Sequence, residues 1–255
     1  MATEVHFEPI QQVRAHEYVA EQIRRHIGLR LIQPGEPLPS ERELASLFGV
    51  GRPTIQHALR LLEAARLVEA RRGRRGGTFV CKPSENDEAM DELIGRVLRE
   101  GEEITELLDW RREVEPAVAG LAATVRRNGD LEVMRATLES MAEAVSEPEY
   151  MRNDTAFHLA IAHATRNRFM VRAIEEIRLR LGDAMTLLPE SDVWHQRISG
   201  EHDEIVAGIE SRDRARTEAA MQVHVAHSEQ GLRAVLEAVR RRRRGRVASL
   251  VRERR

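Results

Sequence analysis

Residues 38–80 read LPSERELASLFGVGRPTIQHALRLLEAARLVEARRGRRGGTFV, and this stretch decides the fold of the first third of the chain. The string SERE at 40–43 has the form of a capping box, in which a serine begins a helix and a glutamate bonds back to it. A glycine turn follows, and Pro53 stands where the first turn of a further helix tolerates proline. Apolar runs at 67–70 and 78–80 flank an arginine- and glycine-rich turn. The pattern predicts a winged helix-turn-helix.

Helices are predicted on both sides of this stretch. An apolar stripe at helical spacing marks a helix at about 12–32. After a polar, proline-containing linker, everything from about 87 to 240 has helical periodicity, without a convincing strand or an internal repeat. The chain is therefore expected to be mainly α, with a second domain built as a bundle of six or seven helices. The expected domains are 1–80 as the winged helix-turn-helix, 81–90 as linker, 91–240 as the helical domain, and 241–255 as a basic tail.

Charge is distributed unevenly along the 255 residues, which carry 40 basic and 42 acidic side chains. Residues 1–80 hold 12 basic and 9 acidic residues, whereas residues 81–239 hold 19 and 32. The last 16 residues hold nine arginines and one glutamate. An anionic partner such as nucleic acid is therefore expected to contact the two ends rather than the acidic middle.

Several classes of protein are excluded by composition. No run of 18 apolar residues exists, and the first 20 residues lack the apolar segment of a secretory signal, so we expect a cytoplasmic protein without membrane contact. One cysteine, Cys81, permits neither an intrachain disulfide nor a cysteine-rich zinc site. The one lysine, Lys82, precedes a proline, which excludes a P-loop.

The stretch quoted above closely resembles the DNA-binding domain of the GntR transcription regulators. The helical half resembles the FCD effector domain of the FadR subfamily, in the strings WRREVEPAVAGLAA, NDTAFHLAIAHATRN, EHDEI and MQVH. Together the two resemblances cover about residues 12–240. They imply that residues 1–80 bind DNA and that residues 91–240 bind an effector and dimerise. They also imply a two-fold dimer that binds a palindromic double-stranded operator. The positions that match the family's DNA contacts are Arg42, Arg52, Thr54 and the wing-tip residues Arg74, Arg75 and Gly76.

The recognition helix departs from the family pattern at two positions. Gly51 replaces the serine that would cap this helix, and Gln56 replaces a base-reading arginine. Arginine suits guanine, whereas glutamine offers one donor and one acceptor that match adenine N6 and N7. We therefore expect an altered operator preference at that base pair, and guanine preference in Gln56→Arg. The terminal run 240–244 is either a frayed helix end or disordered tail, or a site of non-specific phosphate attraction.

Ionisable residues occupy positions in the helical half where apolar core residues are expected. Asp154 and His158 are four residues apart and share one helix face, and His202 lies on an apolar face. His224 also has apolar neighbours, although His227 shares its face. An inward ionisable group is costly unless it is paired or binds a metal.

One carboxylate and three imidazoles form a reasonable site for a divalent metal, Zn²⁺ or Ni²⁺. The resemblance gives the same answer, because many FCD domains bind a metal through one Asp and three His. The matching residues are Asp154, His158, His202 and His224. The alternative is that these histidines are core residues satisfied by hydrogen bonds. We interpret His163, His195 and His227 in that way. If His224 is not a metal ligand, His227 is the residue that would take its place.

Arg111 lies on the apolar stripe of its helix and has two readings. In one it clamps the carboxylate of a small organic-acid effector beside the metal. In the other it forms an intrahelical pair with Glu115.

These features favour a ligand-responsive transcription regulator, most often a repressor in this family. A metal-sensing regulator without an organic effector is one alternative. A metal-dependent hydrolase is another, but no His-Glu-x-x-His motif, nucleophile elbow or glycine-rich phosphate loop supports it. We therefore expect no enzyme.

Overall fold

The computed structural model describes residues 14–73, 76–82, 95, 97, 101–185 and 192–253. The chain divides into two compact units. One comprises residues 1–27 and 32–82, and the other comprises residues 28–31 and 83–255. Each unit has its own cluster of buried apolar side chains.

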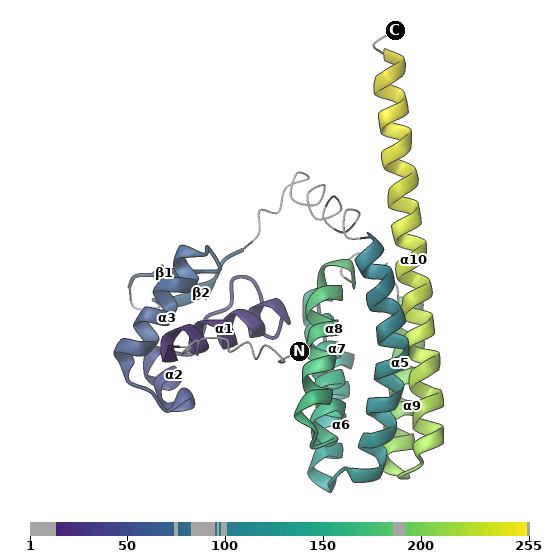
Figure 1. Cartoon of the computed structure of the whole chain (residues 1–255), viewed down its shortest axis with the longest axis horizontal. Coiled ribbons are helices and arrows are strands. Elements are labelled where there is room, and N and C mark those ends of the chain that lie inside the picture. Colours follow the sequence, from purple (N-terminus) through teal and green to yellow (C-terminus); the bar gives the residue numbers. More distant parts are fainter. Residues whose placement is uncertain are drawn as a thin grey trace, which may run out of the picture. The chain divides into compact units, whose positions relative to one another are not determined.

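The first unit is a small domain whose described residues form three helices and a hairpin (Figure 1). The two strands pair antiparallel, with Val68 opposite Val80, and the turn between them is the wing. This arrangement confirms the predicted winged helix-turn-helix. The elements are α1 (Ala15–Gly28), α2 (Glu41–Phe48), α3 (Arg52–Ala64), β1 (Val68–Arg71) and β2 (Gly77–Val80).

The helix boundaries in this unit follow from local chemistry. The Ser40 hydroxyl accepts a hydrogen bond from the Glu43 amide at 3.3 Å, and the Glu43 carboxylate accepts one from the Ser40 amide at 2.8 Å, so the capping box is present. Gly49 ends α2 with a φ of 63°, a left-handed conformation that favours glycine. Gly51 caps α3 without a side-chain hydrogen bond.

The second unit is a helical bundle, as predicted, with six helices among its described residues (Figure 1). The last helix, drawn in yellow, continues through the arginine run at 240–244 to Glu253, whereas the sequence pattern placed its end near residue 240. The predicted segment 88–100 lies almost wholly outside the described residues. The helices are α5 (Gly101–Val125), α6 (Asn128–Ala142), α7 (Glu147–Ala164), α8 (Arg168–Met185), α9 (Asp192–Glu210) and α10 (Arg214–Glu253).

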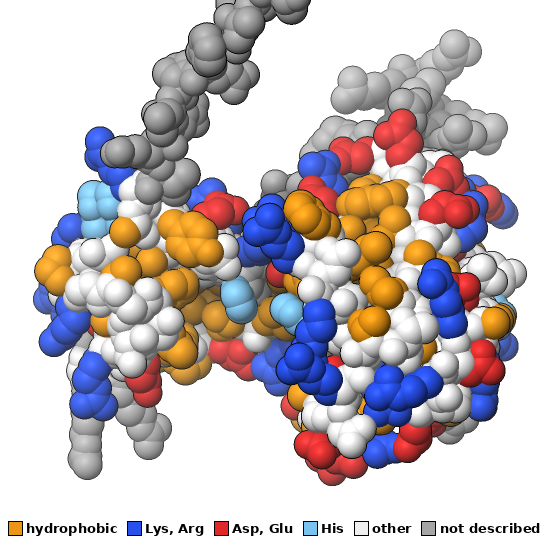
Figure 2. Space-filling view, turned by 60° about the horizontal axis from the view of Figure 1, so that its bottom comes forward, with side chains coloured by type: hydrophobic (Ala, Val, Ile, Leu, Met, Phe, Trp, Pro, Cys, Tyr) orange, Lys and Arg blue, Asp and Glu red, His pale blue; other side chains and the backbone are white. Residues whose placement is uncertain are grey.

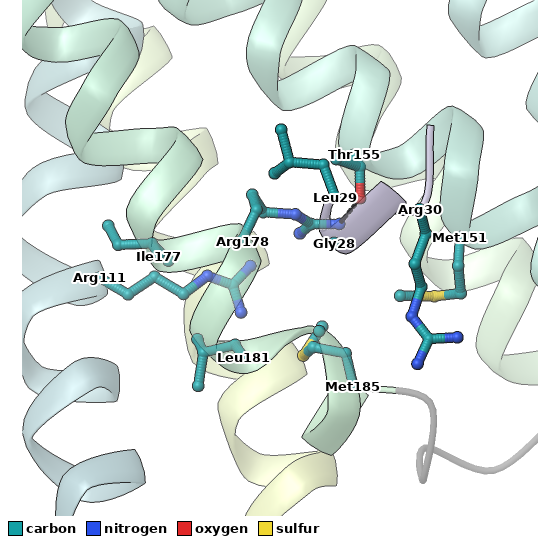
Figure 3. A pocket seen from close by; sticks show the side chains of 11 residues that line it. Gly28, Leu29, Arg30, Arg111, Met151, Thr155, Ile177, Arg178, Leu181 and Met185 are labelled. Atoms are coloured by element: carbon teal, nitrogen blue, oxygen red, sulfur yellow. Dashed lines mark hydrogen bonds between the residues drawn. The ribbon is translucent and has the colours of Figure 1, made fainter. Parts of the chain in front are cut away.

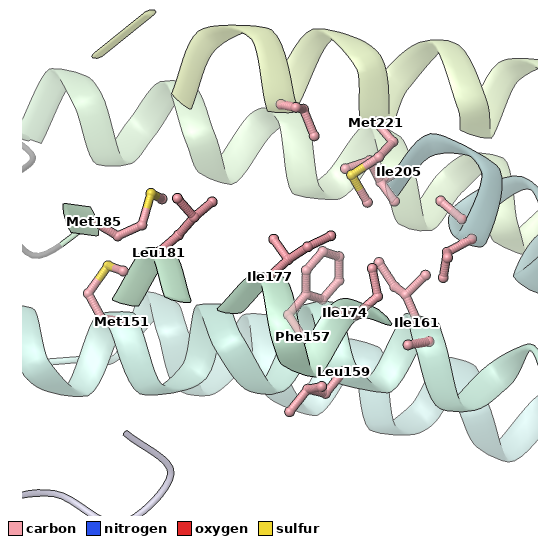
Figure 4. Close-up of a cluster of buried hydrophobic side chains, with 14 of the residues drawn as sticks. Met151, Phe157, Leu159, Ile161, Ile174, Ile177, Leu181, Met185, Ile205 and Met221 are labelled. Atoms are coloured by element: carbon pink, nitrogen blue, oxygen red, sulfur yellow. The ribbon is translucent and has the colours of Figure 1, made fainter. Parts of the chain in front are cut away.

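All six helices contribute buried apolar side chains to the bundle core, and Figure 4 shows large ones from α7, α8, α9 and α10. Phe157, Ile177 and Ile205 are fully buried. Such a core holds the helices at fixed positions, because close-packed side chains resist displacement. It therefore fixes the position of the polar residues that share these faces.

Acidic and basic side chains are interspersed on the visible face of the helical unit (Figure 2). Many arginines of this unit are ion-paired, as Arg216 is with Glu204 at 3.0 Å. Among the described residues, no helix is long and apolar enough to cross a membrane.

Candidate metal site, effector pocket and DNA-reading face

Four buried side chains from three helices meet inside the helical unit. Asp154 and His158 come from α7, His202 from α9 and His224 from α10. One ligand atom from each residue lies within 4.8 Å of the others. Helix α7 places two of them because residues four apart share a face. The set is the one predicted from the sequence, and these four residues could hold a metal ion.

The nitrogens of the cluster are not satisfied by the protein alone. His202 is fully buried, and neither of its ring nitrogens has a hydrogen-bond partner. Nε2 of His158 also lacks one. Nε2 of His202 lies 3.4 Å from Oδ1 of Asp154, and Nε2 of His158 lies 3.8 Å from the same oxygen. Because buried polar groups are nearly always paired, these orphaned nitrogens fit a ligand set better than satisfied core histidines.

The electrostatics of the cluster favour the protonation states that bind metals. Burial, followed by the nearby His224, holds the pKa of His202 well below its usual range, which keeps the imidazole neutral. Burial alone would raise the pKa of Asp154, but Arg178 and then the histidines outweigh it and lower this pKa. An ionised carboxylate beside neutral imidazoles is the form that metal ligation requires.

Glu115 links the cluster to Arg111, and the sequence analysis did not identify it as part of the site. Oε1 of Glu115 accepts a hydrogen bond from Nε of Arg111 at 2.7 Å, while Oε2 lies 2.8 Å from Nδ1 of His158. Both charged side chains are almost completely buried. The contact with Nδ1 leaves Nε2 of His158 directed toward Asp154, which is how outer carboxylates orient ligating histidines.

His224 and His227 take different positions. His224 is buried in the cluster, with Nδ1 at 3.3 Å from Oε2 of Glu201. His227 is 38% exposed and pairs through Nδ1 with the other oxygen of Glu201 at 2.5 Å. His224 rather than His227 therefore belongs to the cluster. His163 is exposed on α7, and the side chain of His195 lies outside the described residues.

A pocket beside the cluster is lined by three arginines, Arg30, Arg111 and Arg178, of which the last two come from different helices of the bundle (Figure 3). Arg178 of α8 donates to Thr155 at 3.0 Å and also to Oδ2 of Asp154. Arg111 of α5 donates to the Ser228 hydroxyl at 2.9 Å, and its Nη2 has no hydrogen-bond partner. Apolar side chains complete the wall, including Met151, Ile177, Leu181 and Met185.

The residues expected to contact DNA lie on α2 and α3 of the first unit. Arg42, Arg52 and Gln56 are exposed, and Thr54 is half-buried. Gly76 lies in the hairpin turn, where its amide donates to the Gly73 carbonyl at 2.8 Å. A side chain at position 76 would lie within 2.5–2.8 Å of backbone oxygens, so only glycine fits there. The wing-tip residues Arg74 and Arg75 lie outside the described residues.

Comparisons with known proteins agree with both units. Residues 15–80 match the family of bacterial regulatory proteins called gntR, and residues 106–227 match the FCD domain. The regulator LutR of Bacillus subtilis (strain 168) is 31% identical over 81% of this chain and 95% of its own length. The chain belongs to the GntR family, in the FadR subfamily with an FCD domain.

Other relatives of this GntR protein cover it to a similar extent. The Uxu operon transcriptional regulator of Escherichia coli (strain K12) is 31% identical over 86% of this chain and 87% of its own length. The repressor NanR of Cronobacter sakazakii (strain ATCC BAA-894) is 29% identical over 85% of each chain. These relatives are transcription regulators, and this protein is a DNA-binding transcription regulator rather than an enzyme.

Proposed function

We propose that this GntR regulator is a cytoplasmic homodimer that binds a palindromic operator and responds to a small carboxylate at a metal site in its FCD domain. One observation carries the proposal. His202 is completely buried, lacks a hydrogen-bond partner on both ring nitrogens, and faces an ionised Asp154 at 3.4 Å. A bound divalent cation would accept the lone pair of one of these nitrogens and offset the carboxylate charge.

Zn²⁺ or Ni²⁺ suits this donor set. Imidazole is a ligand of intermediate softness that both ions accept, and one carboxylate oxygen completes a four-residue set. Asp154 supplies Oδ1, since Arg178 already occupies Oδ2. With four protein ligands, such an ion retains a position for a ligand carboxylate.

Arg111 and Arg178 are the proposed contacts for that carboxylate. Both line the same pocket, and Nη2 of Arg111 is a buried donor without a partner. A guanidinium binds a carboxylate through parallel hydrogen bonds, which gives directionality as well as charge. In this proposal, the two readings of Arg111 are compatible: Nε holds Glu115, and Nη2 is available to the effector.

On the DNA side, we propose that Arg42, Arg52, Thr54 and Gln56 contact the operator, with Arg74, Arg75 and Gly76 at the wing. Residues at the start of a recognition helix reach base edges, while flanking arginines bind phosphates. Exposure of Arg42, Arg52 and Gln56 on adjacent helices supports this assignment. The relative named as a repressor, NanR, supports repression as the mode of action.

Thermal unfolding tests the effector site without knowledge of the operator. The protein is unfolded with Zn²⁺, Ni²⁺ or chelator, against a panel of small carboxylates. A ligand that binds only the folded state raises the unfolding midpoint by mass action. We expect stabilisation by metal and a further rise with one acid, both lost in His202→Gln and retained in the control His163→Gln. A metal response without any acid response would indicate a metal sensor.

Arg111→Lys then tests the clamp. Lysine keeps a positive charge beside the buried Glu115 but lacks the planar fork of the guanidinium. The expected result is a lost acid response with an unchanged metal response. An acid response equal to that of the wild type would show that Arg111 is structural only.

A further inference from the structure

An acidic residue lies among the side chains proposed to read DNA. Glu41 is the first residue of α2, and one of its oxygens serves two partners on α3. Oε2 accepts a hydrogen bond from Nε2 of Gln56 at 2.9 Å and another from Nη2 of Arg52 at 3.2 Å. These are contacts between residues 11 and 15 positions apart, so they join the two helices of the helix-turn-helix.

Stability gives little reason for this arrangement. The side chains of Arg52 and Glu41 are 65% and 34% exposed, and exposed pairs contribute little to folding. A carboxylate near the DNA backbone also repels phosphates, which lowers affinity for every sequence. If Glu41 helps to select among DNA sequences, its presence is explained despite its small contribution to stability and its repulsion of phosphates.

The chemistry of the contact fixes the orientation of the Gln56 side chain. A carboxylate oxygen only accepts hydrogen bonds, so the end of the amide that faces Glu41 is the NH₂ group. That group has two N–H donors, and Glu41 occupies one of them. The second N–H and the amide oxygen remain available as one donor and one acceptor, the pair that adenine N7 and N6 require.

We propose that Glu41 is a positioning residue that holds Gln56 in the orientation for reading adenine. Without Glu41 the amide rotates freely, and its donor and acceptor exchange places at little cost. Arg52 is held in the same way, although its guanidinium retains further N–H groups for the DNA. This inference rests on the proposed base-reading role of Gln56.

Selection from a randomised duplex library with the full-length protein tests the proposal. Gln56→Ala first identifies the base pair whose preference depends on Gln56. In Glu41→Ala, we expect adenine preference at that same base pair to fall by on the order of tenfold, the discrimination a bidentate contact provides. Affinity for unrelated DNA should be unchanged or higher, because a negative charge is removed. A variant that merely misfolds would instead lose affinity for all sequences.

Glu63→Ala is the matched control, since Glu63 is an exposed carboxylate on α3 with the same charge. It should leave the base preference unchanged. An unaltered adenine preference in Glu41→Ala, or an equal loss in Glu63→Ala, would overturn the proposal. If Gln56→Ala alters no base pair, the proposed reading role of Gln56 fails, and the role of Glu41 fails with it.

Discussion

The two carboxylate oxygens of Asp154 have different contacts. Oδ2 accepts from Arg178, while Oδ1 faces Nε2 of both His158 and His202. The arginine keeps the carboxyl ionised despite its burial, and the same arginine lines the adjacent pocket. A ligand that binds Arg178 in the pocket would therefore also affect Asp154, a proposed metal ligand, because Arg178 contacts both.

Glu115 contacts His158, another proposed metal ligand, and its substitution tests whether it orients this histidine. Glu115→Gln should weaken Zn²⁺ binding by roughly 10–100-fold, as losses of outer carboxylates do, because His158 loses its charged partner. Competition with a chromogenic chelator measures the affinity. Glu106→Gln, an exposed change on the same helix, is the control. Equal affinities in the two variants would show that Glu115 does not orient His158.

The four cluster residues were predictable because each carries a polar side chain at an apolar position of its helix. Arg178 carries the same signal, since it is four residues after Ile174 and three before Leu181, and both of these are buried. The contact of Glu115 with His158 was not predictable. It joins residues of α5 and α7, and helical spacing says nothing about which helices pack together.

At the scale of elements, the capping box of α2 provides a test of local stability. Ser40→Ala should destabilise the protein by about 1 kcal/mol, and Ser46→Ala, an exposed change in the same helix, should not. The hydrogen bonds from Ser40 lower the pKa of Glu43. A lowered pKa contributes stability above the ordinary Glu range and loses it as the pH falls through the folded-state pKa. The difference in free energy of unfolding between Ser40→Ala and wild type should therefore narrow as the pH falls below the ordinary Glu range. A constant difference would contradict this reading.

Helices α9 and α10 approach closely where Gly208 meets the start of α10. A Cβ at position 208 would lie 2.6 Å from Oγ1 and 3.0 Å from Cα of Thr217. Gly208→Ala should therefore destabilise the bundle by about 1–3 kcal/mol, because backbone atoms must shift. Gly200 of α9 has nothing within 4 Å of its Cβ position, and Gly200→Ala should stabilise by up to about 1 kcal/mol. Urea denaturation measures the free energy of unfolding of both variants. If both substitutions stabilise the protein, or both destabilise it, the argument that only Gly208 is closely packed would be wrong.

The ends of helices were predictable where a cap or turn marks them, as at Ser40. They were harder to predict where no such residue is present. The sequence pattern placed the end of the last helix near residue 240, because five consecutive arginines repel one another and resemble a tail. The helix nevertheless continues to Glu253. An Arg241–Glu237 pair at 3.1 Å, four residues apart, is one local interaction that favours helix at this point.

At the scale of the whole molecule, two compact units divide the proposed tasks. The first carries the helix-turn-helix, and the second encloses the ionisable cluster. Regulation then requires a coupling free energy between the effector and the operator, of about 1–3 kcal/mol in typical cases. A 5–150-fold change in operator affinity on addition of metal and acid would correspond to that range.

The central claim is that Asp154, His158, His202 and His224 bind one metal ion, and counting the metal tests it most directly. Chelator-treated protein is dialysed to equilibrium against Zn²⁺ or Ni²⁺, and the bound metal is measured by elemental analysis. We predict about one ion per chain in the wild type and in His163→Gln, and a large loss in His202→Gln. Wild-type protein without bound metal, or equal metal in His202→Gln, would contradict the account.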